Sequence, residues 1–109
     1  MRYVRRRYLG VRVESPDAID ESELVKAVWG MIYQLFGEYG ASQAGMIHID
    51  LKHNREITVF RCSHNALDMI RAAIAAISEI NEKQVVLRVV AVSGTLRALS
   101  GKIHQLRMK

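Results

Sequence analysis

The chain has 109 residues and a net charge of +5, and half of its residues are apolar. This is enough for one compact domain spanning residues 1–109, but not for separate cofactor and substrate domains. No segment approaches the roughly eighteen consecutive apolar residues of a membrane span, and no apolar run follows the basic N-terminal residues as in a signal peptide. The single cysteine excludes an internal disulfide, so we expect a cytoplasmic protein without a membrane partner.

The charges are sorted along the sequence. Residues 1–12 hold five bases and no acid, and residues 83–109 hold six bases and no acid. All eleven acids lie between Glu14 and Glu82, in a stretch with only five bases. This segregation favours a polyanionic partner such as RNA, whereas the alternative is a basic protein whose ends are merely solvated.

The first predicted element is a strand over 7–14. Apolar and polar residues alternate along it, which is typical of a strand with one buried face. The apolar positions on that face are Leu9, Val11 and Val13.

A helix over about 21–36 is predicted next, from apolar residues that recur at helical spacing. Asp20, followed three residues later by Glu23, resembles a capping box and predicts the helix start. Gly37 and Gly40 are expected to end the helix, because glycine is favoured after the last helical turn.

Two strands over 46–52 and 56–62 are predicted to form a hairpin, with a tight turn at His53 and Asn54. Both segments are bounded by turn residues, and the first alternates clearly. Its inward-facing residues are expected to be Ile47, Ile49 and Leu51.

The last third predicts a helix, a strand and a short helix. Alanine and isoleucine at helical spacing indicate a helix over 65–80. The valine-rich run over 84–92 is typical of a strand buried on both faces. A final helix is predicted over about 96–107.

This order predicts an α+β fold: a ferredoxin-like, RRM-like βαββαβ sandwich with an antiparallel sheet and an additional short C-terminal helix. Right-handed crossovers place the first strand beside the last, so the two basic ends of the chain would meet on one positive surface. The C-terminal helix or a protein partner is expected to cover the second face of the sheet.

The sequence offers no candidate for catalysis by the protein, because paired carboxylates, a nucleophile elbow and a P-loop are all missing. His48, Asp50 and His53 lie close together in sequence, and the first two share a strand face. A zinc or iron site usually has three or four ligands, often with a cysteine or a further histidine nearby, and none is within reach here, so no metal is expected. Only Tyr8 and Phe60 could stack on RNA bases, and the glycine-aromatic signature of RNA-recognition motifs is missing.

A turn before the last helix is a candidate phosphate contact. A glycine between two hydroxyl residues, followed by a helix, can present backbone N–H groups to a phosphate. The alternative is that the threonine only caps the helix and the glycine only permits the turn. The residues of this turn are Ser93, Gly94 and Thr95.

Four short motifs resemble the archaeal form of the ribonuclease P protein component 2 family. They lie in the expected order over most of the chain. The motifs are Arg-Arg-Tyr-Leu at 6–9, Phe-Gly-Glu at 36–38 with Gly40, Arg-Cys at 61–62, and Val-Ser-Gly-Thr at 92–95.

The resemblance implies that the chain is a non-catalytic protein subunit of an endoribonuclease that removes the 5′ leader from precursor tRNA. In this family the RNA subunit holds the catalytic centre with its Mg²⁺ ions, so no cofactor is expected on the protein. The implied partners are ribonuclease P RNA, precursor tRNA in the holoenzyme, and ribonuclease P protein component 3 in a heterotetramer.

The expected mechanism is electrostatic, with bases from both chain ends neutralising phosphates of the RNA. The rival hypotheses are a ferredoxin-like protein-interaction domain and a small-molecule regulatory domain without an RNA role. The candidate RNA contacts are Arg5, Arg6, Arg7, Arg97 and Lys102, followed by Arg61, Arg88 and Arg107.

Overall fold

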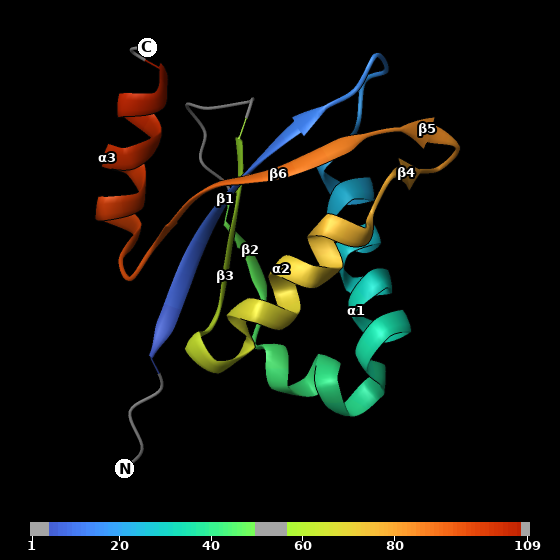
Figure 1. Cartoon of the computed structure of the whole chain (residues 1–109), viewed down its shortest axis with the longest axis horizontal. Coiled ribbons are helices and arrows are strands. Elements are labelled where there is room, and N and C mark those ends of the chain that lie inside the picture. Colours follow the sequence, from blue (N-terminus) through green and yellow to red (C-terminus); the bar gives the residue numbers. More distant parts are fainter. Residues whose placement is uncertain (1–4, 50–56, 108–109) are drawn as a thin grey trace.

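The computed structural model describes residues 5–49 and 57–107, and it shows three layers. One face of a sheet is covered by helices α1 and α2, and the other face carries helix α3 (Figure 1). The elements are β1 (Arg6–Glu14), α1 (Glu21–Ala44), β2 (Ile47–Ile49), β3 (Ile57–Ser63), a 3₁₀ turn (His64–Ala66), α2 (Leu67–Ala76), β4 (Glu79–Ile80), β5 (Lys83–Gln84), β6 (Val86–Ser93) and α3 (Leu96–Arg107).

The main sheet has the strand order β2-β3-β1-β6, and all three neighbouring pairs are antiparallel. The α+β ferredoxin-like prediction is therefore confirmed, including the predicted pairing of the first strand with the last long strand. Tyr8 on β1 lies opposite Arg61 on β3 and opposite Ser93 on β6. The start of β1 and the ends of β3 and β6 consequently meet at one end of the sheet.

The larger core lies between the sheet and helices α1 and α2. The alternation of β1 aims Leu9 and Val11 into this core, as predicted, and both side chains are fully buried. Helix α1 contributes one apolar stripe to it and α2 contributes another, because their buried residues recur every three or four positions. The buried side chains of these stripes are Leu24, Val28, Ile32, Ile70, Ala73 and Ile74.

The smaller core lies on the other face, under α3. Leu99 and Ile103, one helical turn apart on α3, are buried against Val59 of β3 and Ala91 of β6. Gly10 on β1 permits this close approach, because a Cβ there would stand 3.3 Å from Ile103 Cδ1. Of the two covers expected for the second face of the sheet, the C-terminal helix or a protein partner, the structure shows the C-terminal helix.

Helix α1 does not end at Gly37, so this prediction was wrong. Gly37 leaves the helical conformation (φ 72°, ψ −175°) and kinks the chain, but helical structure continues to Ala44. Ala41 and Ala44 are both buried, and their packing holds the added turns against the rest of the protein. Gly45, with φ 56°, is the residue that ends the helix.

Helix α2 ends at Ala76 instead of residue 80, and a small hairpin replaces its predicted last turn. In this hairpin β4 pairs with β5, and Asn81 and Glu82, which both have positive φ, form the turn between them. Two such residues in succession fit a tight turn of the type that joins twisted strands.

The burial predicted for the strands needs two corrections. Strand β6 is an edge strand, and Val86 at its start is 49% exposed, so the strand is not buried on both faces. Ile47 on β2 is 43% exposed, since it faces the α3 side at a point where α3 does not cover the sheet. The predicted turn at 53–54 and Leu51 lie outside the described residues.

Candidate nucleic-acid interface

Arginines from both halves of the chain gather where β1 begins and where β3 and β6 end. The register pairs Arg6 with Ser63 and Arg7 with Cys62, so these arginines lie at the last residues of β3. Helix α3 begins two residues after β6 and brings Arg97 next to the turn at 93–95. We call this region the basic end and define it as Arg5, Arg6, Arg7, Arg61, Arg97 and the turn 93–95.

The side chains of the basic end are mostly open to solvent. Arg5, Arg6 and Arg97 are exposed, whereas Arg7 and Arg61 are partly buried. Arg7 donates a hydrogen bond from Nη1 to the backbone oxygen of Arg6 (3.0 Å), and the same nitrogen lies beside Gly94 of the turn. The backbone N–H of His64 donates to the backbone oxygen of Arg5 at 2.8 Å, which anchors the start of β1.

Thr95 caps helix α3. Its Oγ1 accepts a hydrogen bond from the backbone N–H of Ala98 at 3.1 Å, and its backbone oxygen accepts one from Leu99 N–H at the same distance. The helix-capping alternative for this turn is thus shown. The first turn of α3 contains no acidic residue and Gly94 is exposed, so a phosphate could approach the turn without repulsion. Contact with a phosphate stays a prediction.

Lys102 lies farther along α3 and is tied to the sheet. Its Nζ donates to the backbone oxygen of Val92 at 2.7 Å, although the side chain remains exposed. This bond brings the charge to the end of β6 that adjoins the basic end. Arg107 is the last residue of α3, and its side chain lies outside the described part of the chain.

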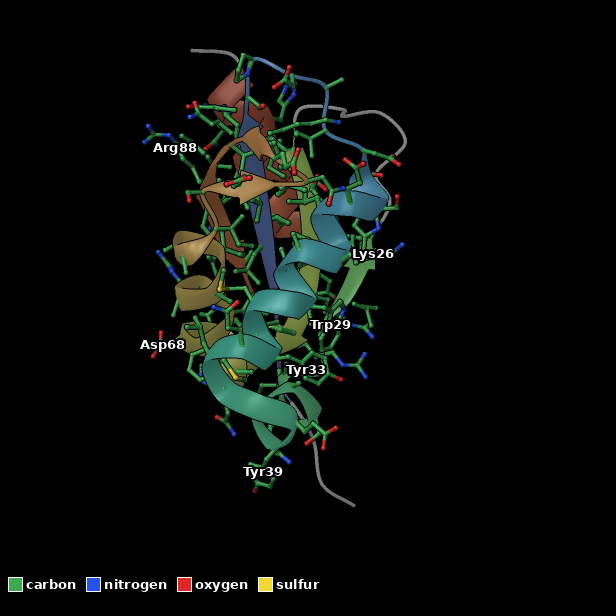
Figure 2. All side chains as sticks on the ribbon, turned by 90° about the vertical axis from the view of Figure 1, so that its right-hand side faces the viewer. Lys26, Trp29, Tyr33, Tyr39, Asp68 and Arg88 are labelled. Atoms are coloured by element: carbon green, nitrogen blue, oxygen red, sulfur yellow. The ribbon has the colours of Figure 1, made fainter. Side chains whose placement is uncertain are left out.

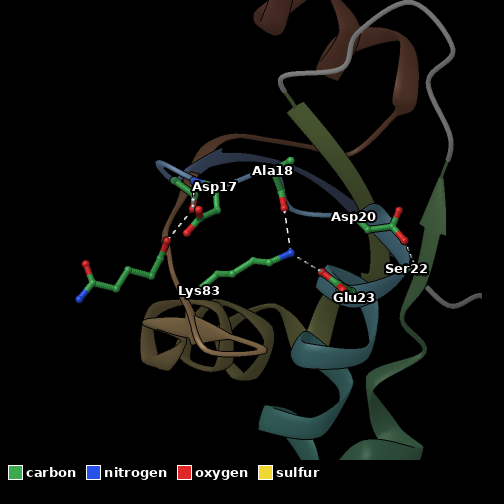
Figure 3. Close-up of polar contacts among 8 residues, drawn as sticks. Asp17, Ala18, Asp20, Ser22, Glu23 and Lys83 are labelled. Atoms are coloured by element: carbon green, nitrogen blue, oxygen red, sulfur yellow. Dashed lines mark hydrogen bonds and ion pairs between the residues drawn. The ribbon is translucent and has the colours of Figure 1, made fainter.

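Two other bases lie at the opposite end of β1 and are already paired with acids. Arg88 on β6 lies 3.4 Å from Glu14 at the end of β1. Lys83 on β5 donates to the backbone oxygen of Ala18 at 3.1 Å and lies 3.8 Å from Glu23 on α1 (Figure 3). The expectation that all eleven bases share one positive surface was therefore too broad.

Cys62 lies next to the basic end but is not a candidate nucleophile. It is fully buried, and this burial raises the pKa of its thiol to about 11, although the nearby charge of Arg7 acts in the opposite direction. At neutral pH the group is a protonated thiol, which is a poor nucleophile.

Among residues 5–49 and 57–107, no three His, Cys, Asp or Glu side chains are close enough to hold a metal ion. Asp50 lies outside these ranges.

Sequence reasoning missed an exposed apolar surface on α1, which we define as Tyr33, Leu35, Phe36 and Tyr39. Tyr33 is 51% exposed and Tyr39 is 79% exposed. The ring of Trp29, which is partly buried against the larger core, lies 6.3 Å from the exposed ring of Tyr33. The available signal was the group of large apolar residues over 33–39, where Gly37 interrupts the helix. Such a patch is typical of a protein–protein contact.

None of the three helices, over the residues that the structure describes, has the length and apolar character of a membrane span.

The sheet, its two helical layers and the basic end together define an α+β protein of ferredoxin-like form with a candidate RNA interface. Residues 7–104 match the family model of the Rpp14/Pop5 family, and the chain belongs to this family.

Curated relatives cover most of the chain and share one name, ribonuclease P protein component 2. The protein of Methanosarcina mazei is 30% identical over 93% of this chain and 85% of its own length. The protein of Pyrococcus furiosus is 26% identical over 90% of this chain and 82% of its own length. A chain in a cryo-EM structure of yeast ribonuclease MRP has the same fold, with a TM-score of 0.67 at 13% identity, covering 99% of this chain and 95% of that chain.

Proposed function

We propose that this chain is a protein subunit of ribonuclease P, which binds and stabilises the RNA subunit during removal of the 5′ leader from precursor tRNA. The observation that carries the proposal is its membership of the Rpp14/Pop5 family over residues 7–104, together with the shared name of its relatives. The basic end supplies a physical basis for RNA binding. The setting would be the cytoplasm, where precursor tRNA is available to an archaeal enzyme.

The proposed role of the basic end is to neutralise RNA phosphates. Arg5, Arg6 and Arg97 are exposed, and the ion pairs of the described residues involve other side chains. Each phosphate neutralised releases condensed counterions, which makes the affinity depend steeply on salt. Cations held at fixed positions by the sheet and by α3 would draw RNA segments together and lower the repulsion within a cleavage-competent fold.

We propose that the RNA subunit, and not the protein, carries out the catalysis. Cys62 is buried and protonated at neutral pH, so it does not suit phosphodiester chemistry. Magnesium ions bound by the RNA would supply the hydrolytic chemistry. The chain would act by stabilising the RNA that holds them, and precursor tRNA would be a partner only in the assembled enzyme.

The proposed protein partner is ribonuclease P protein component 3, in a heterotetramer. What supports a protein partner in this chain is the exposed apolar surface of α1. Residues 27–49 contain no Lys or Arg and a single carboxylate, Glu38, so this helix face suits a protein far better than a polyanion.

Reconstitution tests the proposed function. The chain would be combined with component 3 and an archaeal ribonuclease P RNA, and cleavage of precursor tRNA would be followed at magnesium too low for the RNA alone. We expect 5′-leader cleavage only when both proteins are present. No stimulation of cleavage, with both proteins folded and the RNA competent, would instead favour a protein-interaction domain or a small-molecule regulatory domain.

A pair of charge reversals tests the basic end. Arg6→Glu and Arg97→Glu change exposed side chains on β1 and α3, and we expect each to weaken RNA binding and reduce the salt dependence of the affinity. The matched control is Lys26→Glu, which makes the same charge change on an exposed side chain of α1 (Figure 2). Equal losses for all three variants would show that only the net charge matters.

A further inference from the structure

We propose that the basic end binds the phosphate backbone of base-paired RNA and does not stack on unpaired bases. This inference rests on the proposed RNA role and specifies the class of RNA segment that is bound. It follows from where the aromatic rings and the cations lie in the described part of the protein.

The sheet face that could serve as a base-stacking platform is occupied. RNA-recognition motifs stack bases on aromatic rings of the two central strands, which here are β1 and β3. Leu99 and Ile103 of α3 fill this face and are buried there, and Gly10 of β1 lies directly beneath Ile103. Opening the platform would require α3 to leave its core.

The two aromatic rings on the central strands are poorly placed for stacking. Phe60 of β3 faces the opposite core, is fully buried, and has its ring 5.9 Å from that of His48. Tyr8 of β1 is partly buried and packs into the core beneath α3. One half-covered ring does not provide the row of rings on which successive bases stack.

The exposed rings lie away from the positive charge. Tyr33, Phe36 and Tyr39 project from α1, on the helix-covered side of the sheet, in a segment without Lys or Arg. Single-strand binding surfaces combine stacking rings with a basic groove, and here the two features are separated. The basic end instead offers cations from the start of β1, from the neighbouring strand β3 and from the first turn of α3. A duplex presents more phosphates per unit length than a single strand, so it suits such a surface better.

Competition binding with the full chain tests the inference. Labelled ribonuclease P RNA would be displaced by a short RNA duplex, by the same duplex with permuted sequence, or by a single strand of equal phosphate number. We expect the duplex to compete better than the single strand. Permuting the sequence should change the apparent Kd far less than the roughly tenfold effect of one good base contact.

Two variants sharpen this test. Arg6→Glu should weaken duplex binding, whereas Tyr8→Leu, if it remains folded, should leave the affinity for both competitors unchanged. A single strand that competes better than the duplex, or a Tyr8→Leu loss confined to the single strand, overturns the inference while the proposed function stands. Failure of the duplex to compete, or of both short RNAs, also overturns it. Failure to bind ribonuclease P RNA at all would instead reject the proposed function.

Discussion

Gly10 of β1 lies directly beneath Ile103 of α3, and this contact fixes the third layer of the protein. A Cβ at position 10 would stand 3.3 Å from Ile103 Cδ1 and 3.2 Å from Ile57 Cγ2, closer than ordinary van der Waals contact. We therefore expect Gly10→Val to destabilise the protein by about 1–3 kcal/mol, because a packed core does not accommodate added methyl groups without strain. Thermal or urea unfolding measures the effect.

The control for this prediction is Gly101→Ala in the same helix. Position 101 has no heavy atom within 4 Å of an added Cβ, and the residue lies inside α3. This change should raise the stability by about 0.5–1 kcal/mol, since alanine loses less conformational entropy in a helix than glycine does. Equal stability of Gly10→Val and the unaltered chain would contradict the packing of α3 on β1.

Much of the fold could be predicted from the sequence, because the spacing of apolar residues along a strand or helix follows from which of its faces is buried. The alternation of Leu9 and Val11 predicts the buried face of β1, and the bounds 96–107 predicted for the last helix are those observed. The failures occur where tertiary packing overrides a local rule. Gly37 is a helix breaker locally, but buried Ala41 and Ala44 extend α1 beyond it.

The candidate site was only partly predictable, for a similar reason. Topology sufficed to bring Arg6 and Arg97 to one end of the sheet, because strand order follows from the element order. The pairing of Lys83 with Glu23 and of Arg88 with Glu14 depends on distances of a few ångströms that a sequence does not specify. The exposed apolar surface of α1 was missed because a sequence does not specify which apolar side chains of a helix the tertiary packing leaves uncovered.

Thr95 gives a prediction about the turn before α3. Removing its hydroxyl in Thr95→Ala leaves the N–H of Ala98 without the 3.1 Å acceptor, so we expect a loss of about 1 kcal/mol in unfolding free energy. Thr95→Ser keeps the acceptor and should recover most of this stability. RNA affinity measured on both folded variants then separates the two roles of the turn. A loss of RNA binding in Thr95→Ala alone, at a temperature where both are folded, would indicate that the hydroxyl contributes to RNA binding as well.

Gly37 should tolerate no side chain. Its backbone (φ 72°, ψ −175°) lies in a region that only glycine populates readily, although an added Cβ would meet no neighbour within 4 Å. Gly37→Ala is therefore expected to cost about 1–3 kcal/mol through backbone strain alone. Gly30→Ala, also in α1 and also free of contacts, should instead be stabilising. If the two variants were equally stable in chemical denaturation, the kink would not be a fixed feature of α1.

Cys62 predicts how stability depends on alkaline pH. The folded chain holds the thiol proton more strongly than the unfolded chain, because burial raises the pKa of Cys62 from 9.0 to about 11. Between these values the unfolded state loses its proton first, so the stability contributed by the protonated thiol falls as pH rises. The free energy of unfolding should therefore decline more steeply over this window in the unaltered chain than in Cys62→Ala. Parallel pH profiles would show that the thiol titrates normally when folded.

The exposed apolar surface of α1 yields the last prediction, which rests on the proposed partnership with component 3. Tyr39 is 79% exposed and Tyr33 is 51% exposed, so replacing either by serine should leave the stability of the free chain nearly unchanged. A buried tyrosine at the centre of an interface typically contributes about 2 kcal/mol or more, so each change should weaken component 3 binding by at least tenfold in calorimetry. Val86→Ser, at a 49% exposed apolar residue of the edge strand β6, is the matched control. Undiminished binding of both tyrosine variants, with binding lost in Val86→Ser, would place the partner on the edge of the sheet instead of on α1.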